Sequence, residues 1–236
     1  MSSPAPPHPV PDWTAERRQV LRTALGIGVA TGAYGVSFGA LSTSSGLTIS
    51  QTCALSVLVF TGASQFAFVG VLGAGGGVAS GVATALLLGS RNTLYGLRLA
   101  PLLNLRGLHR LIGAQLVIDE STAVAVGQAD ARAARLGFWS AGLAVYVLWN
   151  TATLVGALAG EAIGDPRTYG LDAAVPAAFL ALLAPRLRGR EPWAVALGAC
   201  VVALVAVPMV PVGAPVLLAA LVAVAVGLRA TGGIRQ

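Results

Sequence analysis

One arginine and a pair of adjacent carboxylates are the residues of this sequence best suited to chemistry in apolar surroundings. Arg91 is the first charged residue after the 68 uncharged residues Thr23–Ser90, and Asp119 and Glu120 are the only acidic residues in 17–129. A charge in apolar surroundings is kept only with a partner, such as an opposite charge, a backbone carbonyl or water. The two carboxylates are therefore the first candidates to neutralise an arginine or to carry a coupling proton.

Each of these charged groups also has a simpler explanation. Arg91 lies about 14 residues into the apolar segment Val78–Leu103, near the bilayer centre if that segment spans a membrane. If the membrane instead ends just before it, the arginine side chain merely extends to the surface. Asp119 and Glu120, for which Arg98 is a second candidate partner, would then belong to a solvated loop or to an amphipathic helix on the inner membrane surface.

Small and polar residues interrupt the uncharged stretch at Phe60-Thr61-Gly62-Ala63-Ser64-Gln65-Phe66 and, at its downstream edge, at Gly89-Ser90-Arg91-Asn92-Thr93-Leu94-Tyr95-Gly96. A glutamine brings two donors and an acceptor that hydrocarbon cannot satisfy, so its side chain must face protein, water or substrate. A hydrogen bond that bridges two helices is one explanation. Because the adjacent glycine and serine permit a broken helix, a place in a substrate pathway is the other. We take the two interruptions as the predicted functional centre, with Gly62, Ser64, Gln65, Arg91 and Asn92 as candidate residues of the substrate or ion pathway.

The composition places these residues in a polytopic membrane protein. Of 236 residues 56% are hydrophobic and 10% charged, with a mean hydropathy of +0.78, whereas roughly a quarter of a soluble domain is charged. A crossing needs about 20 apolar residues, and its backbone amides must pair within the segment, which favours helices. The predicted fold is all-α, with about seven transmembrane helices and at least one broken or re-entrant segment.

The apolar segments divide the chain into one permease domain with two tails. We expect a disordered proline-rich tail over 1–16, a single transmembrane domain over 17–230 and a short tail over 231–236. The expected helical segments are Val20–Ser42, Ser50–Ala74, Val78–Leu103, Leu111–Gln128, Leu136–Gly160, a short segment ending at Pro185, and two short crossings within Pro192–Leu228. Glycines recur at spacings of two to four in the first segment, and we favour helix packing over direct substrate contact as their role.

Arginine groups between the apolar segments predict the topology. The net charge is +6, but the arginines do not form one basic face, so they indicate cytoplasmic loops and not a nucleic-acid partner. The second half is consistent, with the groups at 132–135, 186–190 and 229–235 inside. In the first half, groups at 17–22 and 106–110 both inside require an even number of crossings, yet three apolar segments lie between them. Either the segment with Ser64 and Gln65 is re-entrant, or the N-terminus is outside, or Leu111–Gln128 crosses.

Little in the sequence suggests an enzyme or a metal protein. There is no lysine, no Cys/His cluster with metal-ligand spacing, no HExxH motif and no Ser-Lys dyad. Cys53 and Cys200 lie in apolar stretches and are interpreted as small buried side chains. An intramembrane enzyme is left with only the pair Asp119 and Glu120 as support, and no cofactor is predicted.

Five motifs together resemble one family. They are Gly35-Val36-Ser37-Phe38-Gly39-Ala40, Phe60 to Phe66, Arg91-Asn92-Thr93-Leu94-Tyr95-Gly96-Leu97 with Ala100-Pro101, Asp119-Glu120-Ser121, and Asp172-Ala173-Ala174-Val175-Pro176-Ala177-Ala178-Phe179-Leu180. In this order they resemble the AzlC family of branched-chain amino acid permeases. The resemblance implies the large subunit of a two-component exporter of valine, leucine, isoleucine and sometimes methionine, multi-pass in the inner (plasma) membrane. It also implies a small AzlD-type membrane subunit as partner and coupling to protons.

A zwitterionic amino acid needs donors for its carboxylate, acceptors for its ammonium group and an apolar pocket for its side chain. A half-helix starting within Gly62 to Gln65 would offer free amides and a positive dipole end to the carboxylate, as would Arg91. Asp119 or Glu120 would meet the ammonium group or a proton. The apolar walls are predicted to be Phe60, Phe66, Phe68 and Tyr95.

Two other functions keep the same membrane fold. In the first, the chain is a non-transporting partner or assembly subunit, which predicts no efflux even beside an AzlD-type protein. In the second, the chain imports hydrophobic amino acids.

Overall fold

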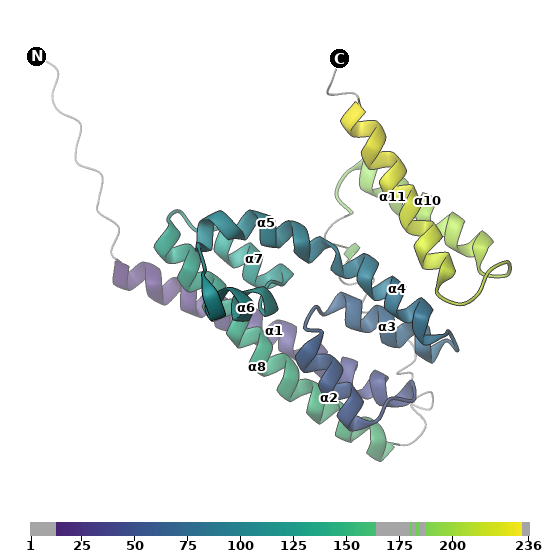
Figure 1. The fold of residues 1–236 in the computed structure, drawn as a ribbon, viewed down its shortest axis with the longest axis horizontal. Helices are drawn as coiled ribbons and strands as arrows, with labels where there is room; N and C mark the ends of the chain where they lie inside the picture. The colour runs from purple at the N-terminus through teal and green to yellow at the C-terminus, as the bar shows by residue number, and fades with distance from the viewer. Residues whose placement is uncertain (1–12, 164–179, 181–182, 185–186, 233–236) are drawn as a thin grey trace, which may run out of the picture.

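The computed structural model describes residues 13–163, 180, 183–184 and 187–232, and this part of the chain is helical with no strand (Figure 1). The predicted all-α class is therefore confirmed for the described residues. Two helices are long and apolar enough to cross a membrane, within Trp13–Ser44 and Ala131–Ala162. Shorter apolar helices are Ile49–Leu58, Ala63–Gly73 and Ala214–Gly227.

Helices α1 (Trp13–Ser44) and α8 (Ala131–Ile163) run side by side and in the same direction (Figure 1). Gly28 of α1 faces Ala144, and Gly35, two turns further on, faces Trp149 and Ala152. A Cβ at Gly28 would lie 2.8 Å from the Cβ of Ala144. The glycines thus let two backbones approach closely, which is the packing role favoured from the sequence.

Helix α1 is longer than expected at its start. It begins at Trp13, so residues 13–16 of the expected tail are helical, and the Arg132 guanidinium lies 3.9 Å from the centroid of the Trp13 ring. This contact joins the first turns of α1 and α8. We call this end of the molecule the start end. The opposite end, at which both α1 and α8 terminate, is called the finish end.

Helices α2 (Ile49–Leu58) and α3 (Ala63–Gly73) form a hairpin that opens at the finish end. Helix α2 packs along α8, where the Oγ atom of Ser56 lies 3.2 Å from Oγ1 of Thr153. Helix α3 then returns, because a Cβ at Gly73 would lie 2.6 Å from Oγ of Ser45, just beyond the end of α1. We call residues 49–73 the first hairpin and residues 57–62 its tip.

The reversal at this tip depends on Gly62 and Gln65. Gly62 has φ +64°, a conformation that favours glycine. The side chain of Gln65 accepts a hydrogen bond from the Gly62 amide at 3.1 Å and donates one to the Leu55 carbonyl at 3.0 Å. The predicted break in Ser50–Ala74 is confirmed, and the segment turns back on itself.

Helices α4 (Val78–Gly89) and α5 (Arg91–Leu103) follow each other with only Ser90 between them. Helix α4 runs antiparallel to α3, since Gly81 faces Phe68 and Gly89 faces Ser64. Helix α5 continues toward the start end, where Leu99 and Leu103 join the same buried cluster as Phe138. Together α4 and α5 connect the two ends of the molecule.

Helices α6 (Gly107–Gln115) and α7 (Asp119–Val126) form a second hairpin, which opens at the start end. Gly113 faces Leu105, and Val124 of α7 packs against Gly137 near the beginning of α8. The second hairpin comprises residues 107–126, and we call residues 115–119 its tip. The expected Leu111–Gln128 segment is thus neither one continuous helix nor a surface helix, because its middle reverses and is buried.

The two tips meet in the middle of the molecule. The side-chain amide of Gln115 donates to the Val57 carbonyl at 2.8 Å and to the Leu58 carbonyl at 3.3 Å. The Oγ atom of Ser121 holds the second tip by donating to the Leu116 carbonyl at 2.6 Å and accepting from the Ile118 amide at 3.1 Å. Two hairpins that enter from opposite ends therefore share one contact region.

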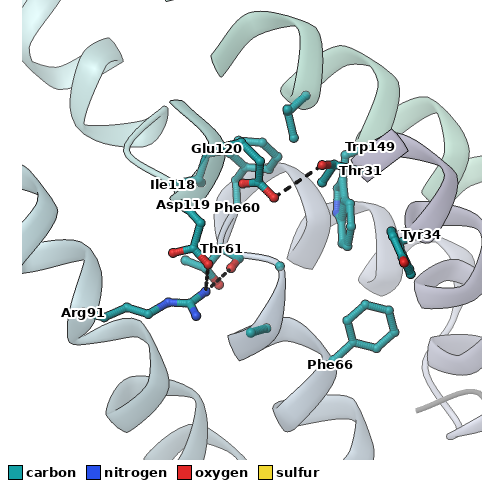
Figure 2. Close-up of a pocket in the computed structure, with 13 residues that line it drawn as sticks. Thr31, Tyr34, Phe60, Thr61, Phe66, Arg91, Ile118, Asp119, Glu120 and Trp149 are labelled. Atoms are coloured by element: carbon teal, nitrogen blue, oxygen red, sulfur yellow. Dashed lines mark hydrogen bonds and ion pairs between the residues drawn. The ribbon is translucent and has the colours of Figure 1, made fainter. Parts of the chain in front are cut away.

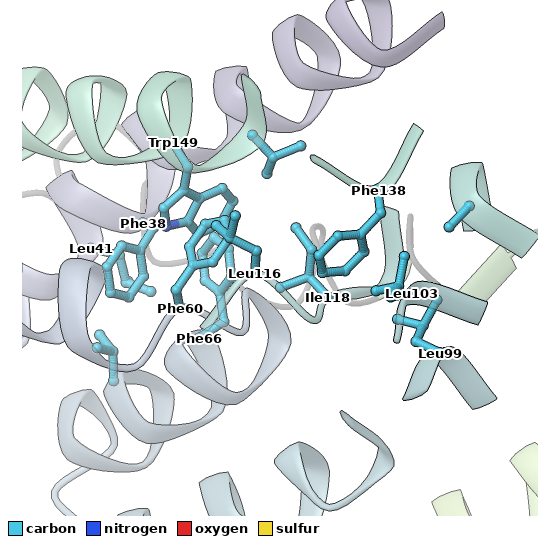
Figure 3. Close-up of a cluster of buried hydrophobic side chains, with 13 residues drawn as sticks. Phe38, Leu41, Phe60, Phe66, Leu99, Leu103, Leu116, Ile118, Phe138 and Trp149 are labelled. Atoms are coloured by element: carbon cyan, nitrogen blue, oxygen red, sulfur yellow. The ribbon is translucent and has the colours of Figure 1, made fainter. Parts of the chain in front are cut away.

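Aromatic side chains fill the core between the tips, α1 and α8 (Figure 3). The ring of Phe38 lies edge-on to Phe66 at 5.5 Å and stacks on Trp149 at 5.9 Å, centroid to centroid. Phe60 contacts the Tyr146 ring edge-on at 4.9 Å. The first tip is thereby packed against both long helices.

Helices α10 (Arg190–Ala206) and α11 (Ala214–Gly232) form a pair at one side of the molecule (Figure 1). Their connection reaches the finish end, where Gly213 lies close to Ser80 and Val71. This agrees with the two short helical segments expected within Pro192–Leu228. The expected short segment ending at Pro185 and the motif Asp172 to Leu180 lie largely outside the described residues.

Candidate functional site

A pocket lies where the two hairpin tips meet α1 and α8 (Figure 2). Its volume is about 100 Å³, and since ~10–15 Å³ by this kind of measure holds one water, it has room for a small organic molecule. The lining residues are Thr31, Tyr34, Phe60, Thr61, Gly62, Ala63, Phe66, Arg91, Ile118, Asp119, Glu120, Val145 and Trp149.

One end of the pocket is an ion pair. Nη2 of Arg91 lies 3.2 Å from Oδ2 of Asp119, and it donates a hydrogen bond to the Thr61 carbonyl at 3.4 Å. Arg91 is the first residue of α5 and Asp119 the first residue of α7, so two helix starts bring the charges together. The predicted partner of the arginine is confirmed.

Glu120 forms a separate polar group. Its carboxylate accepts a hydrogen bond from Thr31 Oγ1 at 3.4 Å, while the Asp119 carboxylate faces Arg91 (Figure 2). Burial of a carboxylate without an arginine partner is costly unless a ligand, a proton or other polar groups compensate it. The pocket therefore offers a cation at one position and, at another, an acidic side chain that forms no ion pair among the described residues.

The remaining walls are apolar or aromatic. The wall residues that carry large side chains are Tyr34, Phe60, Phe66, Ile118, Val145 and Trp149. Trp149 is buried, and its Nε1 atom has no hydrogen-bond partner among the described residues. Such a wall suits an aliphatic group, and the indole nitrogen adds one donor.

Six of the ten predicted site residues line this pocket: Phe60, Gly62, Phe66, Arg91, Asp119 and Glu120. Ser64 is buried beside Gly89 of α4, and Gln65 is used to close the first tip. Asn92 and Tyr95 lie on α5 outside the pocket lining. Phe68, predicted as a wall, instead packs beside Gly81.

The sequence reasoning missed several lining residues. Thr31 and Tyr34 lie in the glycine-rich part of α1, where we favoured packing over substrate contact, and Val145 and Trp149 lie on α8. The sequence contained part of the information needed to find them. Thr31 carries a hydroxyl group in a glycine-rich helix, and Trp149 directly precedes the polar residues within 150–153. Periodicity alone does not show which face of α8 meets the hairpin tips.

The described residues contain no group of three or more His, Cys, Asp or Glu side chains that would hold a metal ion.

Comparison with known proteins gives the chain its family. The family model described as AzlC protein matches residues 26–163, which include α1 from residue 26 onward, α2 to α8 and every residue that lines the pocket. The chain belongs to the AzlC family. This is a membrane protein family associated with transport and is not an enzyme family.

A relative from Archaeoglobus fulgidus, described as an uncharacterized membrane protein, is 34% identical over 157 residues. The match covers 66% of this chain and 68% of the relative. No solved structure matches the chain significantly. Together with the two long apolar helices, the family match and this relative show that this AzlC protein is a membrane protein.

Proposed function

We propose that this AzlC protein is the large subunit of a secondary-active exporter of branched-chain amino acids, namely valine, leucine and isoleucine, with methionine as a further candidate. The observation that carries the proposal is the pocket between the hairpin tips, which combines one arginine, two carboxylates and aromatic walls. These are the groups that a small amino acid with an aliphatic side chain requires.

The substrate carboxylate is assigned to Arg91 and to the start of α3. A guanidinium offers two parallel donors to a carboxylate. Helix α3 begins at Ala63 beside Gly62, and both residues line the pocket, so the positive end of this helix dipole adds to the same binding position. The ammonium group is assigned to Glu120 and the aliphatic side chain to the aromatic wall around Phe60.

The proposed topology treats both hairpins as re-entrant. Arginines 17–22, 106–110 and 132–135 then lie at the start end, which the positive-inside rule places in the cytoplasm. Two membrane passes separate the first two arginine groups: α1 is one pass, and α4 together with α5 is the other. The number of passes is therefore even, as the charges require. The described membrane passes are α1, α4 with α5, α8, α10 and α11, in an inner membrane protein with several passes.

Outward apolar surface fits this arrangement. Leu25, Leu86 and Leu204 have relative exposures of 58%, 69% and 67%, which is unfavourable in water and favourable in lipid.

Export and proton coupling follow from the resemblance to the family, and Glu120 is the candidate proton carrier. It is half-buried at the tip contact, lines the pocket and forms no ion pair with an arginine among the described residues. A carboxylate in this position can take either a proton or an ammonium group, which makes the two exclusive. Because the proton and the substrate cannot occupy this carboxylate together, the transport of one can be coupled to the transport of the other.

An efflux assay tests the function. Cells that express the chain with its proposed AzlD-type subunit are loaded with a leucine dipeptide, and the loss of intracellular leucine is followed. We expect faster efflux than from cells with an empty vector, and loss of most of this difference in Arg91→Gln and Glu120→Gln. The matched control is Arg98→Gln, which removes a charge from an exposed position of the same helix.

Three outcomes contradict the proposal. Unchanged efflux in both pocket variants at normal protein levels would refute the site. No efflux with the small subunit present would favour the non-transporting partner, and net leucine uptake down the same gradient would favour an importer.

A further inference from the structure

Arg91 is held by both hairpin tips at once. The same atom, Nη2, contacts Oδ2 of Asp119 in the second hairpin at 3.2 Å and the Thr61 carbonyl of the first tip at 3.4 Å. The Nε atom of Arg91 is buried and has no hydrogen-bond partner among the described residues. One guanidinium therefore connects the tips while part of its donor capacity is still unused.

The ion pair faces the pocket. The side chains of Arg91 and Asp119 are 24% and 28% exposed, and both line the cavity. An arriving carboxylate is the same chemical group that Asp119 already presents to the guanidinium. The two carboxylates must therefore compete for one cation, or share it at the cost of their mutual repulsion.

Glu120 forms no ion pair with Arg91 and is hydrogen-bonded elsewhere. It follows Asp119 directly in the sequence, yet its carboxylate faces Thr31 on α1 (Figure 2). The turn at the start of α7 thus separates two neighbouring carboxylates into different surroundings. Different surroundings assign them different roles.

We propose that Asp119 is a positioning residue that holds Arg91 in the empty site and releases it to the carboxylate of the substrate, whereas Glu120 is a direct ligand of the ammonium group. This inference rests on the proposed function and adds the roles of the two carboxylates to it. Since Asp119 and Thr61 belong to opposite hairpins, exchange of Asp119 for substrate also removes one link between the tips. Binding is thereby coupled to the hairpin contact.

The test compares the two neighbouring carboxylates. Equilibrium binding of radiolabelled leucine to the purified full chain with its small subunit, and the initial rate of efflux, are measured for wild type, Asp119→Asn, Asp119→Glu and Glu120→Gln. We expect Asp119→Asn to bind leucine about three- to tenfold more tightly, because the internal competitor is gone. Its efflux rate should fall, because release no longer has a returning carboxylate to favour it.

The other variants should differ in a defined way. Glu120→Gln should bind leucine about tenfold more weakly or worse, since a charged ligand of the ammonium group is lost. Asp119→Glu keeps the competing charge and should return both measurements toward wild type. If Asp119→Asn does not give folded protein, Asp119→Ser removes the same charge and is measured in its place.

The results that overturn the inference are distinct from those that overturn the function. If wild type binds and exports leucine but the neutral variant at 119 binds it equally or more weakly, Asp119 is not a competitor, although the exporter assignment stands. If Glu120→Gln binds leucine as wild type does, the assignment of the ammonium group is wrong. If wild type neither binds nor exports leucine, the proposed function fails, and the inference fails with it.

Discussion

Gln65 holds the first hairpin tip with both ends of its side-chain amide. It is fully buried, accepts from the Gly62 amide and donates to the Leu55 carbonyl. From the sequence, a bridge between helices and a place in the substrate pathway were both open. The contacts support the bridge, because both amide ends are already used within the hairpin.

Gln65→Ala should therefore act on stability first. It leaves the Gly62 amide without its partner and removes one of two hydrogen bonds to the Leu55 carbonyl, which also accepts from the Val59 amide. We expect a loss of about 1–3 kcal/mol in the free energy of unfolding. A thermal unfolding scan of purified protein in detergent measures this as a lower melting temperature.

Gln128→Ala is the matched control for Gln65. The Gln128 amide donates only to the Val124 carbonyl one turn earlier, so its loss should change the melting temperature little. A melting temperature of Gln65→Ala equal to that of Gln128→Ala, together with lost leucine binding, would return Gln65 to the substrate pathway.

For individual residues, the kind of partner that a side chain needs was easier to predict from the sequence than the residue that it contacts. A buried arginine needs a partner, and few carboxylates were present to supply one, so the link between Arg91 and Asp119 could be expected. The sequence did not predict that Asp119 and Glu120 contact different partners. This difference depends on the direction of each side chain at the start of α7, which sequence spacing does not determine.

Among the elements, the α1–α8 pair depends on small residues along its contact. A Cβ at Gly35 would lie 2.7 Å from the Trp149 carbonyl oxygen and 3.0 Å from the Cβ of Ala152. Gly35→Ala must therefore push the two helices apart, beside a tryptophan that lines the pocket. We expect it to cost about 1–3 kcal/mol and to lower both the melting temperature and leucine efflux.

Gly26→Ala tests the same substitution in the same helix without the contact. Nothing lies within 4 Å of a Cβ at Gly26, and alanine is favoured over glycine in a helix interior by up to about 1 kcal/mol. This variant should be neutral or slightly stabilised. Equal losses in both variants would show that the glycines act through helix propensity and not through packing.

Helices were easier to predict than hairpins for a physical reason. Length, apolar content and interrupting residues placed segments close to those observed, including the break near Gly62. A segment that crosses and one that turns back have the same composition and nearly the same length. The direction after the break is decided by contacts such as Gly73 with Ser45, which join residues far apart in the sequence.

Over the whole molecule, the proposed topology with two opposed hairpins accounts for the even number of passes that the first two arginine groups require. Three apolar segments separate the first two groups, but one of them begins and ends at the finish end. A re-entrant segment was one of three explanations open from the sequence. The topology proposed here selects it and adds a second hairpin of opposite direction.

Cysteine labelling distinguishes this topology from one in which the hairpin segments cross. In a background with Cys53→Ala and Cys200→Ala, single cysteines are placed at the exposed positions Ser50 and Ala74, which lie in the first turn of the first hairpin and just after its last residue. In separate variants, cysteines replace the exposed His109, in the first turn of the second hairpin, and the exposed Ala129, just beyond its end. A membrane-impermeant thiol reagent is then added to intact cells.

We expect cysteines at positions 50 and 74 both to react from outside, because both ends of the first hairpin lie at the finish end. Cysteines at 109 and 129 should both react only after the membrane is permeabilised, since the second hairpin opens toward the cytoplasm. The parent without cysteines gives the background signal. A segment that crosses the membrane would place the two labelled positions of its pair on opposite sides. If the two cysteines of either pair react from different sides, the opposed hairpins are refuted. The pocket would then not be enclosed by two hairpins that enter from opposite sides of the membrane.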